Sequence, residues 1–150
     1  MVQELNSFTY SEVKGAVKNG EKGHGFPCKL VASANAGDFV KQTSVTGSKV
    51  ITVTPITADT DIIFGMIPYE ASKKNAYVSG DMVTVMTDYT VAVCEASAAI
   101  AAGVTVMPVV SGMKVATQTT GKTILGIALK PAAADTNLVE VLVKTVVKSA

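Results

Sequence analysis

Reactive side chains are few in this chain, and the first to consider is its one histidine. His24 lies between two glycines in the run Lys-Gly-His-Gly. A catalytic triad needs a base that a third group holds rigidly, and a glycine-flanked loop is a poor support for such a base. We therefore expect His24 to be a solvated loop residue. Ser111 lacks the preceding glycine of a nucleophile elbow, and we expect it in a turn between strands.

The run Gly121-Lys122-Thr123 resembles the end of a phosphate-binding loop. That motif requires a second glycine five positions before Gly121, where this chain has Ala116. The run also leads into a Val/Ile/Leu-rich segment typical of a strand, whereas a phosphate cradle needs the N-terminus of a helix. The pattern favours a hairpin turn.

Metal ligands are equally sparse. Asp59 and Asp61 flank one threonine and could hold a hard cation, but calcium takes about six to eight oxygen ligands and no third acid is adjacent. Cys28 and Cys94 with His24 do not complete a four-ligand zinc site, and there is no CxxC motif. A disulfide between the cysteines stays open, although so few cysteines suit an intracellular chain with reduced thiols. We predict no metal, no cofactor and no enzymatic activity.

Composition narrows the classes of partner. The net charge is +1 and all 13 basic residues are lysines, so the chain lacks the arginines that recognise phosphate groups bidentately and the positive field of a nucleic-acid binder. Aromatic residues are 5% of the chain and tryptophan is absent, which argues against a carbohydrate platform or a base-stacking sheet. Neither a signal peptide nor an apolar stretch of about 18 residues is evident. We expect a soluble protein that binds neither nucleic acid nor membrane.

The sequence predicts that the elements that position these residues are β-strands. Counting gives 23 valines and 17 threonines, whose branched side chains favour β-structure. The predicted fold class is all-β, a small antiparallel β-barrel or sandwich of about seven or eight short strands. The expected strands are Lys49–Thr54, Asp61–Ile67, Met82–Thr87, Thr90–Cys94, Val104–Val110, Lys114–Thr117, Thr123–Lys130 and Leu138–Val147.

Local signals add detail to this pattern. The apolar run Asp61–Ile67 predicts a strand buried on both faces, and Gly65 within it predicts a bulge or a close backbone approach. Asp88-Tyr89 predicts a tight hairpin turn between two strands. Ala96–Ala102 predicts one or two turns of helix at most, with Gly103 as its C-cap.

The N-terminal region differs from the rest. We predict two parts, an extended N-terminal arm at 1–36 and a β-body at 37–150. Ser7–Lys18 could form a short amphipathic helix, and the glycine-rich run at 19–27 reads as a loop or tether. An equally supported alternative places Lys29–Val31 inside the first strand of the body.

The order of these glycine and alternation patterns resembles the body of tailed-phage head decoration proteins, also called structural cement proteins. In that family a strand with an internal glycine leads to a Gly-Asp strand, an Ile-x-x-Gly turn and an Ile-x-Gly-x-Ala strand, which an alanine-rich turn follows. The matching positions are Gly65, Gly80-Asp81, Ile100 with Gly103, Gly126 with Ala128, and Ala132–Ala134. The resemblance covers roughly residues 62–147.

The resemblance implies a viral structural protein of the virion. Such a protein is made in the host bacterial cytoplasm and binds the outer surface of a phage head, which it stabilises against internal pressure. Its partner would be the major capsid protein, and its own state a homotrimer, with a homodimer as the alternative. The candidate capsid contacts are Phe8, Tyr10 and Phe26, since aromatic side chains make useful anchors. The alternative for these three residues is burial in the body's own core.

A second function stays open from the sequence. The chain could be a β-barrel receptor- or glycan-binding module of a phage tail or surface protein, contacting its target through loops. Such a module would need more surface aromatics than four tyrosines and four phenylalanines supply.

Overall fold

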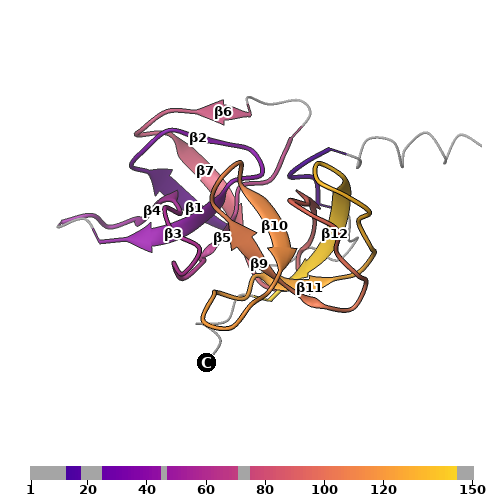
Figure 1. Ribbon diagram of the computed structural model, residues 1–150. Coiled ribbons are helices and arrows are strands. Elements are labelled where there is room, and N and C mark those ends of the chain that lie inside the picture. The colour runs from indigo at the N-terminus through magenta and orange to yellow at the C-terminus, as the bar shows by residue number, and fades with distance from the viewer. Residues whose placement is uncertain (1–12, 18–24, 45–46, 71–74, 145–150) are drawn as a thin grey trace, which may run out of the picture.

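The computed structural model describes residues 13–17, 25–44, 47–70 and 75–144. Within these residues all regular secondary structure is β-strand. Figure 1 shows two main groups of strands, indigo to magenta on one side and orange to yellow on the other. The all-β class is therefore confirmed, with twelve short strands in the described part of the chain.

The first group is a closed barrel with the strand order β1-β4-β3-β5-β7. The pairs are antiparallel except for β1 with β4, which is parallel. Closure leaves no free edge that could pair with another chain. The strands are β1 Gly25–Leu30, β3 Phe39–Thr43, β4 Ile51–Pro55, β5 Gly65–Met66 and β7 Met82–Met86, and a small separate pair is formed by β2 Ala34–Asn35 and β6 Ala76–Tyr77.

The barrel interior follows the two-residue alternation of its strands. In β1, Cys28 and Leu30 are buried and Lys29 between them is exposed. Gly65 lies where β5 crosses β7, and a Cβ atom there would meet the carbonyl oxygen of Met86, so the expected close backbone approach is confirmed. The interior side chains are Cys28, Leu30, Ala34, Val40, Val53, Ile67, Val83 and Val85.

The second group is a five-stranded antiparallel sheet with the order β10-β9-β11-β12-β8. A parallel bridge between Ala96 and Val115 joins the end of β8 to β10, so the sheet curls back on itself. Its strands are β8 Val91–Glu95, β9 Thr105–Val109, β10 Lys114–Thr117, β11 Gly126–Ala128 and β12 Leu138–Val143.

A shared apolar core joins the two groups. Phe39 and Met66 pair across β3 and β5, yet both belong to the core of the second sheet rather than to the barrel interior. Ile56 and Ile63 join them there. Burying a side chain of this size stabilises a fold by about 1.5–3 kcal/mol. Burial of apolar side chains therefore holds the barrel against the sheet, as it also stabilises the interior of each group.

The N-terminal arm needs correction. β1 is a barrel strand paired on both sides, as in the alternative that put Lys29–Val31 in the body. At 13–17 there is a turn and a bridge rather than helix, and Gly15 donates its N–H to the Val93 carbonyl at 2.8 Å. A boundary at residue 36 therefore divides strands of one barrel. Residues 1–12 and 18–24 lie outside the described residues.

The predicted hairpin around Asp88-Tyr89 is wrong. β7 pairs with β1 and β5, whereas β8 pairs with β12. The turn between them carries the chain from the barrel to the second sheet. Burial of side chains explains why these two strands pair with different neighbours. The inward side chains of β7 fill the barrel, whereas those of β8 lie in the core of the second sheet.

Two further elements differ from expectation. In the segment Asp61–Ile67 only Gly65–Met66 is strand, because Asp61 caps a turn and Ile63 is buried without strand pairing. Ala96–Ala102 is not helical. Instead, Ile100 pairs with Ala132 in an isolated bridge, since burial of both side chains favours an extended path over helix.

Candidate functional site

Phe26 is the one predicted contact residue within the described part of the chain; Phe8 and Tyr10 lie outside it. Phe26 continues the inward alternation of Cys28 and Leu30, but it stands at the open end of the barrel and is 39% exposed. Its ring meets that of Phe64, with centroids 5.7 Å apart and planes tilted by 52°. Phe64 packs in turn against the barrel core. An exposed ring that packs on a partly buried ring forms a firmly supported apolar surface.

Tyr89 lies at the same end of the molecule. Gly25 pairs with Met86 across β1 and β7, so the turn that follows Met86 is next to the start of β1. The Tyr89 N–H donates to the Val143 carbonyl at 2.7 Å, and the Val143 N–H donates to the Thr90 carbonyl at 2.8 Å. These two bonds hold the turn against the end of β12. The Tyr89 side chain is 59% exposed.

A third loop reaches this end through Thr123. The Thr123 hydroxyl donates to the Asp61 carbonyl at 2.8 Å, and Ile62, the next residue, is 56% exposed. Two residues beyond Thr123, the Leu125 carbonyl accepts from the Lys144 N–H at 2.9 Å. We call Phe26, Ile62, Phe64 and Tyr89 the aromatic end; Lys122 and Lys144 stand at its border.

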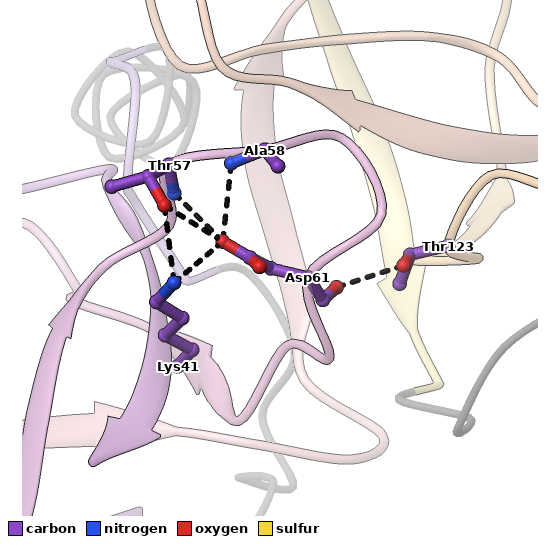
Figure 2. A network of polar contacts seen from close by, with 5 residues as sticks. All are labelled: Lys41, Thr57, Ala58, Asp61 and Thr123. Carbon is purple, nitrogen blue, oxygen red and sulfur yellow. Dashed lines mark hydrogen bonds and ion pairs between the residues drawn. The ribbon is translucent and has the colours of Figure 1, made fainter.

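The Asp59–Asp61 pair forms a structural clamp. One Asp61 oxygen accepts from the amides of Thr57 at 2.8 Å and Ala58 at 3.1 Å, and from Lys41 Nζ at 2.9 Å, as Figure 2 shows. Burial alone raises the pKa of Asp61, but these donors outweigh it and lower the pKa below its usual value. Both carboxylates of the pair therefore have donors within the protein.

Asp59 extends this clamp to the second sheet. Its carboxylate accepts from the Val110 N–H at 2.9 Å, and its carbonyl accepts from the Thr123 N–H at 3.2 Å. Together with the Thr123 hydroxyl on Asp61, these bonds fix the loop of the aromatic end to both strand groups. The sequence showed two acids at a turn; it did not show the donors that are distant in the chain, Lys41 and Val110.

The remaining reactive candidates are placed as follows. Ser111 lies in the exposed turn between β9 and β10, and Gly121-Lys122 forms a turn that leads to β11 rather than to a helix. Cys28 and Cys94 are free and buried in different cores, so they do not pair. Burial raises the pKa of both thiols, that of Cys94 to about 12. His24 lies outside the described residues.

One hollow in the described part of the chain can be compared with known ligand pockets. A hollow of about 130 Å³ lies between β8, β12 and the Lys130-Pro131 turn, beside a Lys130–Glu140 ion pair of 3.2 Å. Ligand pockets are usually about 300 Å³ or larger. Across the described ranges, no group of three or more His, Cys, Asp or Glu side chains is placed to hold a metal ion, and no helix is long and apolar enough to cross a membrane.

The sequence prediction named Phe26 and did not include Tyr89, Ile62 or Phe64. An aromatic side chain within a predicted turn was the available signal for Tyr89, since turns lie on the surface. No signal in the sequence brought these residues together with Phe26. Neither a family model nor a curated protein matches this chain.

Proposed function

We propose that this chain is a capsid decoration, or cement, protein, which binds the outer surface of an assembled phage head through the aromatic end. The observation that carries the proposal is the exposure of Phe26, Ile62 and Tyr89 together at one end of a closely packed all-β body. Buried aromatic anchors dominate the binding energy of protein interfaces. The resemblance to the cement family supplies the identity of the partner, the major capsid protein.

The body suits this role physically. Its two cores hold the loops of the aromatic end in place through backbone bonds and the Asp59–Asp61 clamp, so little conformational entropy is lost when that end docks. Both cysteines are buried and free, which fits assembly in a reducing cytoplasm.

The proposed mechanism is thermodynamic linkage. A protein that binds the intact shell but not its separated subunits stabilises the shell by mass action, with many copies per particle. In this proposal the chain acts as a homotrimer, with a homodimer as the alternative, because its symmetry then matches a site where several coat subunits meet.

Co-sedimentation with undecorated shells tests the proposal. The chain should pellet with shells in a saturable way and stay in solution with unassembled coat protein. Phe26→Ala should weaken this binding about tenfold or more, the loss typical of an anchor residue. Binding to host cells but not to shells would instead support the receptor- or glycan-binding alternative.

A further inference from the structure

We propose that the outer face of the second sheet binds a second copy of this chain and is the contact that builds the homo-oligomer. The inference rests on the proposed function for the arrangement of the copies, and it adds the contact surface. The outer face is the side of β8, β11 and β12 that is turned away from the barrel (Figure 1), because their other side packs on the core that includes Phe39 and Met66. By the alternation of side chains along a strand, its residues are Val91, Val93, Glu95, Ile127, Leu129, Leu138, Glu140 and Leu142.

Apolar side chains occupy both faces of these strands. The inner face is fully buried and holds Ala92, Cys94, Ala128, Val139, Val141 and Val143. In an antiparallel sheet with one face in water, the outward positions are usually polar. In β12, however, two of the three outward residues are the partly exposed Leu138 and Leu142, and the neighbouring Leu129 is 43% exposed. Strands that are apolar on both faces are typical of sheets that are buried on both, so we infer that a partner completes this burial.

The charges on the outer face indicate the partner's chemistry. Glu140 forms an ion pair with Lys130 at 3.2 Å, and Glu95 lies 3.9 Å from Lys14 Nζ. Because each acid has a lysine of the same chain beside it, the face presents no net charge for a partner to match. The complementary surface is therefore apolar and neutral, and a second copy of this chain brings such a face.

A protruding side chain and a hollow lie at the same level of the outer face. The hollow of about 130 Å³ lies between β8, β12 and the Lys130-Pro131 turn. Leu129 directly precedes that turn, and its N–H donates to the carbonyl of Glu140 at 2.8 Å. Glu140 is itself one of the residues that line the hollow. The hollow is smaller than most ligand pockets, and we expect Leu129 of one copy to enter the hollow of another.

This equal level is compatible with the arrangement that shell binding needs. Rotation about an axis parallel to β12 keeps every residue at its own height along that axis, so it can bring Leu129 to the hollow of the next copy. The same rotation keeps the aromatic ends of all copies at one end of the oligomer, because the turn at Tyr89 is bonded to Val143 at the end of β12. Closed symmetry of this kind lets every aromatic end contact one shell surface.

The experiment compares the full chain with Leu129→Glu and Met82→Glu by sedimentation velocity in the absence of shells. Met82 is the matched control, because it is an apolar residue of the barrel strand β7 that is 54% exposed and lies outside the outer face. The full chain and Met82→Glu should sediment as the same oligomer. Leu129→Glu should sediment as a monomer, because the contact would bury an unpaired charge. Leu129→Ala, which adds no charge, should raise the dissociation constant of the oligomer about tenfold. Far-UV circular dichroism should be the same for all of them, since both side chains are exposed.

Co-sedimentation with undecorated shells separates this inference from the proposed function. If Leu129→Glu is a monomer and the full chain an oligomer, but the full chain does not bind shells, the contact stands and the proposed function fails. A monomeric full chain, or a Leu129→Glu variant that forms the same oligomer, overturns the contact even where shells are bound. If the full chain is a monomer and Leu129→Glu loses shell binding, the outer face belongs to the coat protein. If instead Leu129→Glu binds shells normally but unfolds at a lower temperature, another part of the same chain covers the face.

Discussion

Replacing Asp61 by alanine should weaken the whole fold, because this carboxylate joins the loop of the aromatic end to the barrel. The change removes four charge-assisted hydrogen bonds, from Thr57 N, Thr57 Oγ1, Ala58 N and Lys41 Nζ. Such a bond is worth roughly 1.5–3 kcal/mol when well buried. The Asp61 side chain is 20% exposed and Thr57 is exposed, so water replaces part of what is lost.

We therefore expect Asp61→Ala to lower the free energy of unfolding by about 2–3 kcal/mol. For a chain of 150 residues, this corresponds to a fall in Tm of roughly 5–10 °C. Urea unfolding followed by far-UV circular dichroism is the suitable assay, since the chain has no tryptophan. The midpoint should fall while the slope of the transition stays the same.

A surface ion pair supplies the control. Asp135 contacts Lys114 at 2.8 Å, but its side chain is 60% exposed, and ion pairs in solvent contribute little. Asp135→Ala should leave the midpoint unchanged within error. An Asp61→Ala variant as stable as the full chain, or one no weaker than Asp135→Ala, would refute the clamp.

The pH dependence follows from the lowered pKa of Asp61. A carboxylate whose folded-state pKa lies below its ordinary value of 3.8 stabilises the fold above that pH, and its contribution is lost as pH falls through the folded-state pKa. The difference in stability between the full chain and Asp61→Asn should thus be complete at neutral pH and shrink below about pH 4. The raised pKa of Asp38 acts in the opposite direction in both proteins and cancels in the difference.

Three other predictions follow from the packing. Gly126→Ala should cost about 3 kcal/mol in the free energy of unfolding by urea titration, because the new Cβ would meet the Leu142 carbonyl. Cys28 and Cys94 should resist thiol reagents at pH 8 in the native state and react after unfolding, since both are buried with raised pKa values. Deleting residues 1–17 should lower Tm, because 13–17 bonds to the edge of β8.

Each of these has a control or a contrary result. Gly103→Ala should cost only about 1 kcal/mol, since its φ of +85° is unfavourable but no atom lies within 4 Å of the new Cβ. Rapid labelling of either thiol in the native protein would contradict the burial described. If deleting residues 1–17 left Tm unchanged, the arm would be separable from the body after all. Deleting residues 1–12 alone should lower Tm less than deleting 1–17.

Sequence reasoning predicted strands best where side chains alternate. β10 is found at its predicted residues, and β12 begins at Leu138 as expected, because a half-buried strand shows its two faces in its sequence. The sequence gives the strand β1 only as an alternative to the arm, because Pro27 and the neighbouring glycines are typical of a loop. Pro27 stands before the first residue of β1 that pairs with β4, which is where a strand tolerates proline.

The sequence did not predict which strands pair with each other or which residues come together at the aromatic end. β7 and β8 looked like a hairpin because only two residues separate their predicted ends, but their partners are chosen by burial in separate cores. Ile62 and Tyr89 come from loops whose positions depend on bonds to Thr123 and Val143. Contacts across such distances in the chain leave no local pattern in a single sequence.

The most direct test of the proposed function is the temperature at which undecorated shells break open, measured with increasing amounts of the full chain. The cement proposal predicts that this temperature rises with occupancy and levels off when the sites are full. Phe26→Ala should need a higher concentration to give the same rise. Saturating binding that leaves the temperature unchanged would contradict the proposal, as would the absence of any binding.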